Sequence, residues 1–251
     1  MCGRYVSVKS TDDLVDEFDA VDETEGGTGT GTGYNIAPTT GVRIVVNRVP
    51  HGAPEGAAPV RQLRVARWGL VPSWAKDPSV GSRMFNARAE SVTEKSAFRK
   101  AFAARRCLVP ADGWYEWRRA EDAEGKPAKQ PFLMTPPDGH SLAFAGLFEF
   151  WKPKAEPDAD WLTSVTVLTV AARGELAEIH DRMPLVLPRA GWTRWLDPAG
   201  AGPEELLRPD DEAHREQLEL RPVSTRVNSV ANDAPDLLDR VEPSVPAQSL
   251  F

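Results

Sequence analysis

Cys2 directly follows the initiator Met1, so removal of Met1 would leave a chain that begins with a cysteine. Its α-amine would have a pKa near ~7.7–8 and its thiol one near ~8.5, so both groups have reactive fractions near neutral pH. The amine can act as the base for its own thiol. The pair can also condense with an aldehyde and close to a thiazolidine. Taken by itself, a cysteine at position 2 favours the reading that it has no chemical role, and the rest of the chain changes this balance.

Three other segments carry side chains suited to proton transfer or hydrogen bonding. Asn86, Arg88 and Glu90 would share one face of an extended segment. Glu116 lies among tryptophan and tyrosine residues, where desolvation would raise its pKa into the range useful for proton transfer. His180 ends a predicted short helix and is suited to acid–base work near neutrality. The structural alternatives are a solvated strand face, a carboxylate paired with an arginine, and a histidine at a helix C-terminus.

Positive charge is concentrated in one part of an otherwise acidic chain. The net charge of the protein is −7, but residues 61–106 contain eleven Lys or Arg and three acidic residues. Within this segment, Arg67–Lys76 interleaves Trp68 and Trp74 with basic residues. That pattern is typical of a platform for single-stranded nucleic acid, where bases stack on rings and cations follow phosphates. The alternative is that the tryptophans are core residues and the cations pair with acidic parts of the surface.

Hydrophobic periodicity predicts more strands than helices. The predicted strands are Val42–Val46, Gln62–Trp68, Trp114–Trp117, Pro131–Met134, Leu142–Phe148 and Ser164–Ala171. The predicted helices are Thr11–Asp19 with Thr11 as N-cap, Lys95–Ala104, Gly174–His180, Ala190–Leu196 and Pro203–Leu207. Strands and helices do not alternate regularly. We therefore expect an α+β fold with a mostly antiparallel, barrel-like curled sheet and short flanking helices.

Length and composition predict a single domain over residues 1–251. Residues 22–33 form a Gly/Thr-rich stretch that lacks the lysine of a phosphate-binding loop and is expected to be a flexible surface loop. Residues 201–251 are acidic and rich in proline. Two cysteines cannot form a disulfide framework, and no signal peptide or membrane-spanning stretch is present. These features predict a cytoplasmic protein, associated with the nucleoid if the source is prokaryotic.

Several motifs in the same order resemble the SRAP family (SOS response-associated peptidase; abasic-site-processing proteins). They are Met1–Tyr5, Tyr34–Pro38, Trp68–Trp74, Asn86–Glu90, Arg106–Trp117 and His180–Leu187. The resemblance spans nearly the whole chain and implies one SRAP domain. Ala75 is a departure, because some relatives have a second tryptophan at that position.

The resemblance implies a protein of the DNA damage (SOS) response that cross-links to abasic sites in single-stranded DNA through a thiazolidine at Cys2. It assigns Asn86 to holding the N-terminus and the sugar, Glu116 to proton transfer near the amine, and His180 to opening the sugar ring. It implies DNA-binding roles for Arg4, Asn35, Pro38, Trp68, Trp74, Arg88, Phe98 and Thr169. No metal or cofactor is implied, and the partner is abasic single-stranded DNA bound by a monomer.

Two other functions fit part of the pattern. Met-Cys-Gly also opens glutamine amidotransferases of the N-terminal-nucleophile class, and the family name implies amide cleavage, which could be limited to the protein's own N-terminus. Such a hydrolase would need an oxyanion hole but no basic, tryptophan-rich groove. A non-covalent single-strand binding module, in which Cys2 has no role, is the second alternative. A denaturing gel with abasic DNA separates that module from a covalent mechanism.

Overall fold

The structure is a computed structural model that describes residues 2–25, 30–50, 52–121, 126–156, 158–200, 202–208 and 218–243. Part of the predicted Gly/Thr loop (residues 26–29) and much of the acidic C-terminal region (209–217 and 244–251) lie outside these residues. None of the helices in the described ranges is long and apolar enough to cross a membrane.

Five strands close into a barrel. They are β4 (Gly41–Arg48), β5 (Val60–Trp68), β7 (Arg106–Ala111), β10 (Leu142–Trp151) and β11 (Leu162–Ala171). Neighbouring strands run antiparallel in the order β5-β4-β7-β10-β11, and a parallel pairing of β11 with β5 completes the ring. Three short strands are added to it, namely β2 (Val21–Asp22), β6 (Asn86–Arg88) and β12 (Arg182–Pro184).

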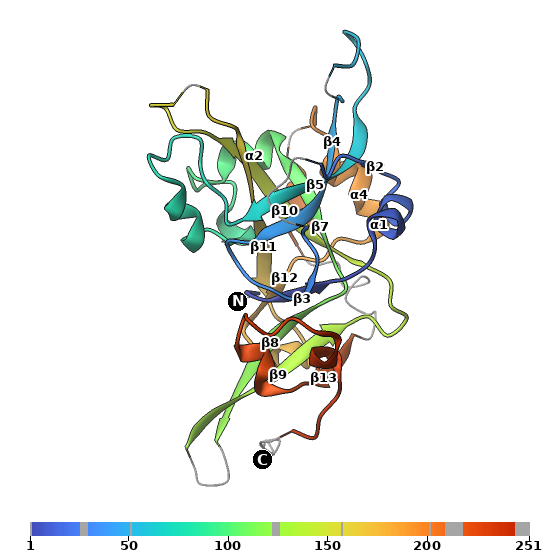
Figure 1. The fold of residues 1–251 in the computed structure, drawn as a ribbon, viewed down its shortest axis with the longest axis vertical. Helices are drawn as coiled ribbons and strands as arrows, with labels where there is room; N and C mark the ends of the chain where they lie inside the picture. Colours follow the sequence, from blue (N-terminus) through green and yellow to red (C-terminus); the bar gives the residue numbers. More distant parts are fainter. Residues whose placement is uncertain are drawn as a thin grey trace.

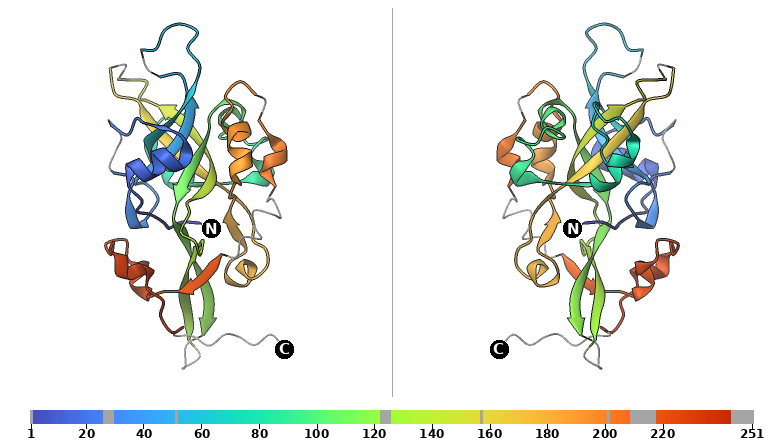
Figure 2. Two further views of the ribbon diagram at one scale, coloured as in Figure 1. Left: turned by 90° about the vertical axis from the view of Figure 1, so that its right-hand side faces the viewer. Right: turned by 90° about the vertical axis from the view of Figure 1, so that its left-hand side faces the viewer.

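A second, five-stranded sheet lies against one end of the barrel. Its order is β13-β9-β8-β1-β3. The strands are β1 (Tyr5–Ser7), β3 (Gly33–Ile36), β8 (Gly113–Glu121), β9 (Pro127–Thr135) and β13 (Glu219–Pro222). The β8–β9 hairpin extends from the lower end of the barrel, whereas the β4–β5 and β10–β11 hairpins project from the upper end (Figures 1 and 2).

The helices are short and lie outside the sheets. They are α1 (Thr11–Phe18), α2 (Arg99–Ala104), α3 (Leu176–Ile179) and α4 (Arg189–Leu196). In the part of the chain that the structure describes, 3₁₀ helices cover Pro78–Arg83, Ala89–Ser91, Glu204–Leu207, Thr225–Asn228 and Pro235–Leu238. α1 and α4 meet where the rings of Phe18 and Trp192 stack, with centroids 4.5 Å apart. Trp195 of α4 donates from its indole Nε1 to the carbonyl oxygen of Cys107, which fixes the helix to β7.

Aromatic rings fill the region where the barrel meets the second sheet. Tyr5 makes edge-to-face contacts with Trp68 and Phe144, at centroid distances of 5.3 and 6.2 Å. Trp114 makes a similar contact with Phe144 at 5.9 Å. All four rings are buried. Such contacts add to the large hydrophobic contribution of buried rings, so the N-terminal strand is packed into the core only three residues after Cys2.

The predicted fold class is confirmed, and all six predicted strands occur, most of them longer than expected. The strands β1, β2, β3, β7, β12 and β13 were not predicted, because they are short or contain a proline, which weakens a strand pattern. The predicted N-cap of the first helix was wrong. Ser10, not Thr11, caps α1, because its hydroxyl accepts from Asp13 N–H while the Asp13 carboxylate accepts from Ser10 N–H.

Candidate functional site

The backbone that follows Cys2 is held on both sides by β-sheet pairing. β1 lies between β8 and β3, with Tyr5 opposite both Trp114 and Ile36. The N–H of Tyr115 donates to the carbonyl oxygen of Arg4 at 3.0 Å. Cys2 itself is fully buried. The sheet therefore sets the position of the first residues before any substrate is present.

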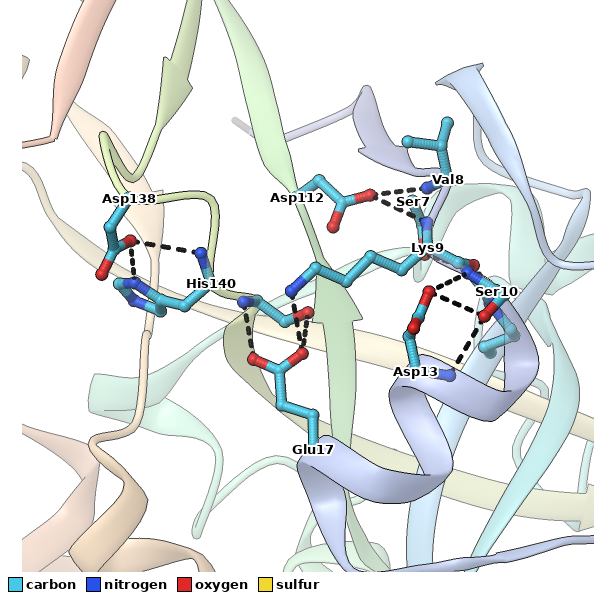
Figure 3. Close-up of polar contacts among 11 residues, drawn as sticks. Ser7, Val8, Lys9, Ser10, Asp13, Glu17, Asp112, Asp138 and His140 are labelled. Carbon is cyan, nitrogen blue, oxygen red and sulfur yellow. Dashed lines mark hydrogen bonds and ion pairs between the residues drawn. The ribbon is translucent and has the colours of Figure 1, made fainter.

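Side chains hold the next stretch of the N-terminal segment, as Figure 3 shows. The Asp112 carboxylate accepts hydrogen bonds from the N–H groups of Val8 and Lys9 at 2.6 and 3.4 Å. The Lys9 ammonium pairs with Glu17 of α1 at 2.9 Å. Arg43 inside the barrel donates to the carbonyl oxygen of Lys9 at 2.7 Å. These contacts fix where the segment leaves the core and so limit movement of Cys2.

Asn86 contacts the backbone of Cys2 directly. It begins β6, which pairs in parallel with β11 so that Asn86 lies opposite Val167. Its Nδ2 donates to the carbonyl oxygen of Cys2 at 2.6 Å. Its Oδ1 is buried and has no hydrogen-bond partner among the described residues. That oxygen can therefore accept a hydrogen bond from an amine or a sugar hydroxyl that enters the site.

Glu116 is a buried carboxylic acid on β8. Strand alternation places it on the same side as Trp114, and only 3% of its surface is exposed. Burial raises its pKa from the ordinary 4.5 to about 7. The pKa of the Cys2 thiol is raised first by burial and then by the negative charge of Glu116, which places the two side chains in one electrostatic environment. Glu116 can therefore both donate and accept a proton near neutral pH.

His180 lies next to Glu116 at the end of α3. Its Nε2 atom is 4.0 Å from Oε2 of Glu116. Its Nδ1 atom lies 3.0 Å from the backbone nitrogen of Arg182 and 2.9 Å from Oδ1 of Asp181. Only an unprotonated Nδ1 can accept from the Arg182 N–H, whereas the Asp181 carboxylate can bind only an Nδ1 that carries a proton, so these two contacts favour different tautomers. Burial lowers the pKa of His180, which favours the neutral ring.

The structure thus brings together the four residues predicted to be catalytic. Cys2 comes from the N-terminus, Asn86 from β6, Glu116 from β8 and His180 from the segment before β12. Together they provide a thiol, an amide that binds the carbonyl oxygen of Cys2, a carboxylic acid with a near-neutral pKa and a neutral imidazole. This set of groups can carry out addition to a carbonyl and loss of water. Their individual roles stay predictions.

The residues predicted to bind DNA fall into two groups. Trp74 is 55% exposed and Arg88 is also exposed, while Pro38 is half-buried beside a hollow of about 490 Å³. Trp68 is fully buried, and its Nε1 donates to the carbonyl oxygen of Phe85 at 2.9 Å. Phe98 and Thr169 are buried as well. Trp74 and Arg88 can therefore contact a ligand directly, whereas the buried Trp68, Phe98 and Thr169 offer no exposed face to one.

Arg4 and Asn35 bind another part of this chain. One guanidinium nitrogen of Arg4 donates to Oδ1 of Asn35 at 2.9 Å and to the carbonyl oxygen of Val227 at 2.8 Å. The amide nitrogen of Asn35 donates to three carbonyl oxygens, those of Val227, Ser229 and Asn232. In this structure both side chains attach the segment around residues 225–232 to β1 and β3.

Arg182 was not among the residues predicted from the sequence. Its guanidinium makes two hydrogen bonds to Glu90, at 2.7 and 2.9 Å, and contacts the carbonyl oxygen of Thr169 at 2.5 Å. Its position inside the motif His180–Leu187, two residues after His180, was a signal for it. Within the described ranges, no group of three or more His, Cys, Asp or Glu residues could hold a metal ion.

Comparison with known proteins identifies relatives over almost the entire chain. A family model described as SOS response associated peptidase (SRAP) matches residues 1–230. Abasic site processing protein YoqW of Bacillus subtilis (strain 168) is 34% identical over 242 residues, which cover 95% of this chain and 99% of that protein. YoaM, described in the same way and from the same organism, is 35% identical over 243 residues, covering 95% and 98%.

A vertebrate protein and two crystal structures also match. Abasic site processing protein HMCES of Gallus gallus is 32% identical over 86% of this chain and 68% of its own length. A phage-related protein from Bordetella bronchiseptica has a TM-score of 0.63 and 29% identity, covering 89% of this chain and 95% of its own. A protein from Bacteroides thetaiotaomicron has a TM-score of 0.74 over 96% of this chain and 100% of its own. Its 20% identity shows the shared fold alone.

Proposed function

This chain belongs to the SRAP family, and from that premise we propose that it processes abasic sites in DNA by a covalent link through Cys2. The curated relatives are named as abasic site processing proteins, which supports the substrate class. The cross-link requires that Met1 be removed, because the amine of Cys2 is otherwise part of a peptide bond. No metal or cofactor takes part.

The proposed reaction joins the two functional groups of Cys2 to one aldehyde carbon. The neutral amine adds to the aldehyde of the ring-opened sugar and gives a carbinolamine. Loss of water from this carbinolamine requires a proton donor and leaves an imine. The Cys2 thiol then adds its sulfur to the imine carbon and its proton to the nitrogen, which closes a thiazolidine. Overall one C–N and one C–S bond form and one water molecule is released.

Glu116 and His180 fit different proton transfers in this sequence. Glu116 shares the buried environment of Cys2, and its pKa of about 7 allows it to protonate the departing hydroxyl of the carbinolamine. His180 lies farther towards solvent and is neutral near pH 7, because burial lowers its pKa. The role proposed for it is to exchange protons with the sugar oxygens, so that the cyclic hemiacetal opens to the aldehyde. Asn86 holds the carbonyl group of Cys2 during both steps.

The proposed DNA partner is single-stranded. Trp74 offers an exposed ring for base stacking, and Arg88 is an exposed cation on the strand that carries Asn86. A base can reach a tryptophan face only when it is not paired, which favours single strands. The buried Trp68, Phe98 and Thr169 would support the walls of this surface without touching bases.

The observation that most strongly supports this function is the buried Glu116, with a pKa of about 7, between Cys2 and His180. The test is to incubate the Met1-free protein with a single-stranded oligonucleotide containing one abasic site and to analyse it on a denaturing gel. The matched control is a tetrahydrofuran analogue of the abasic site, which cannot open to an aldehyde. We expect a slowly migrating adduct with the abasic site only. Absence of the adduct, or equal adduct with the analogue, would refute the proposal.

A further inference from the structure

Glu90 and Arg182 connect the two segments that carry Asn86 and His180. Glu90 lies in the 3₁₀ helix directly after β6, and Arg182 begins β12. Both carboxylate oxygens of Glu90 accept hydrogen bonds from the Arg182 guanidinium, at 2.7 and 2.9 Å. This bidentate geometry restricts both side chains more than a single ion pair would. The Arg182 side chain is 13% exposed and the Glu90 side chain 54%.

The backbone of Arg182 connects its side chain, which Glu90 holds in place, to the imidazole of His180. The N–H of Arg182 donates to Nδ1 of His180 at 3.0 Å. The same guanidinium that binds Glu90 also donates to the carbonyl oxygen of Thr169 on β11, which fixes Arg182 across the strand pair. The position of the Arg182 backbone therefore orients the imidazole, whose Nε2 lies 4.0 Å from Oε2 of Glu116, and opposes the preference of the Asp181 carboxylate for a protonated Nδ1.

The segment that carries His180 consists of short elements, although Leu176 and Ile179 pack against the core and the Ala172 N–H donates to the carbonyl oxygen of Asp181. α3 has only four residues and none of them is buried. β12 has three residues and pairs with β11 at Thr169, Val170 and Ala171. The Asp181 side chain is exposed. Short and exposed elements are the parts of a fold that open most readily. We therefore expect the ion pair between Glu90 and Arg182 to reduce local opening of this segment.

We propose that Glu90 is a positioning residue for His180, acting through Arg182, in the opening of the abasic sugar. This inference rests on the proposed function. Glu90 does not need to touch the substrate, since its carboxylate is used by Arg182. The pair with Arg182 lowers the pKa of Glu90, so the carboxylate is ionised and the clamp is intact throughout the neutral range.

The test separates sugar opening from the later steps by using two substrates. One is a single-stranded oligonucleotide with an abasic site, whose sugar is mainly a cyclic hemiacetal. The other carries a linear alkyl aldehyde at the same position and needs no ring opening. Glu90→Ala should lower the saturating cross-linking rate on the abasic site about tenfold, because misplaced catalytic groups lose orientation. It should leave both the rate on the linear aldehyde and the half-saturating DNA concentration unchanged. Glu90→Asp should recover part of the lost rate.

The matched control is Glu94→Ala, which removes an exposed carboxylate from the same segment and should behave as wild type on both substrates. Equal slowing of Glu90→Ala on both substrates would overturn the inference, as would no slowing on either. Tighter DNA binding with an unchanged rate would also overturn it, because Glu90 would then only shield Arg182 from phosphate.

A spectroscopic measurement tests the same contact without any reaction. In the wild-type protein, ¹⁵N shifts of the His180 ring measure the balance between the Arg182 N–H, which favours an unprotonated Nδ1, and the Asp181 carboxylate, which favours a protonated one. Glu90→Ala should shift this balance towards the tautomer with the proton on Nδ1, and an unchanged spectrum would contradict the positioning role. If the wild-type protein formed no cross-link with either substrate, the proposed function would fail, but the ring shifts would still decide whether Glu90 positions His180.

Discussion

Nε2 of His180 lies 4.0 Å from Oε2 of Glu116, and the two side chains have reversed the usual order of their pKa values. Burial raises the pKa of Glu116 to about 7 and lowers that of His180 below 6.5. Near neutral pH the pair therefore combines a carboxylic acid that is about half protonated with a mostly neutral imidazole. One pair of neighbouring groups can thus supply an acid for loss of water near Cys2 and a base for the sugar.

Glu116→Gln should slow adduct formation and change its pH dependence. In the wild type, the rate should fall as pH rises above about 7, because Glu116 loses the proton that removal of water requires. Glutamine cannot donate such a proton, so the variant should be slower and should lack this decline. Single-turnover rates between pH 5 and 9 measure the effect. A decline near pH 7 that persists in the variant would assign the titration to another group.

The same substitution should change stability in a direction that depends on pH. Because the folded-state pKa of Glu116 lies above its ordinary value of 4.5, its contribution to stability is present below pH 4.5 and is lost as pH rises through about 7. The loss is at most about 3 kcal/mol. Urea denaturation gives the free energy of unfolding of both proteins. The value for Glu116→Gln minus that for the wild type should therefore be more positive at pH 8 than at pH 4.

His180→Ala should slow cross-linking to an abasic site by roughly 100-fold, a common effect of removing a general acid–base group. The linear aldehyde should react at close to the wild-type rate, because it needs no ring opening. Release of the cross-link should also slow if the same group serves the reverse reaction. Stopped reactions analysed on denaturing gels give all three rates. Equal loss on both substrates would place His180 in the addition steps instead.

Trp74→Ala should weaken binding of single-stranded DNA by about 1–3 kcal/mol, the usual contribution of one base stacked on an aromatic ring. Trp161→Ala is the matched control, because this tryptophan is also exposed but its ring lies against Lys152 at 5.0 Å. Fluorescence anisotropy with an intact oligonucleotide measures both variants without the covalent step. Equal weakening by the two substitutions would show that any exposed tryptophan has this effect.

Asn35→Ala should destabilise the fold by about 1–3 kcal/mol, because it removes hydrogen bonds to three carbonyl oxygens, of which that of Val227 is buried. The amide holds the carbonyl oxygens of Val227, Ser229 and Asn232 and accepts from Arg4. Thermal unfolding of the free protein measures this loss. A variant with normal stability but weak DNA binding would instead support a direct contact between Asn35 and DNA.

The sequence predicted the local features of the site well. Alternation along β8 placed Glu116 beside Trp114, and the expected rise of its pKa follows from that burial. The barrel was predicted from strand patterns without regular helices. These features depend on neighbouring residues, which a single sequence shows directly.

Long-range contacts limited the rest of the prediction. Trp68 and Trp74 look alike within the basic segment, but pairing of β5 with β11 places Trp68 opposite Val165 in the core and leaves Trp74 exposed. Arg4 and Asn35 are bound by residues around Val227, about two hundred positions away in the chain. Such partners cannot be identified from the local pattern around either residue.

Intact mass spectrometry of the unreduced product tests the central role of Cys2 most directly. Met1-free wild type should give a species with the mass of protein plus abasic oligonucleotide minus one water, and borohydride should add no hydrogens because a thiazolidine has no imine. Cys2→Ser keeps the amine but lacks the thiol, so it should give at most an imine that survives only after reduction. Equal yields of unreduced, denaturant-stable adduct from wild type and Cys2→Ser would contradict a thiazolidine at Cys2.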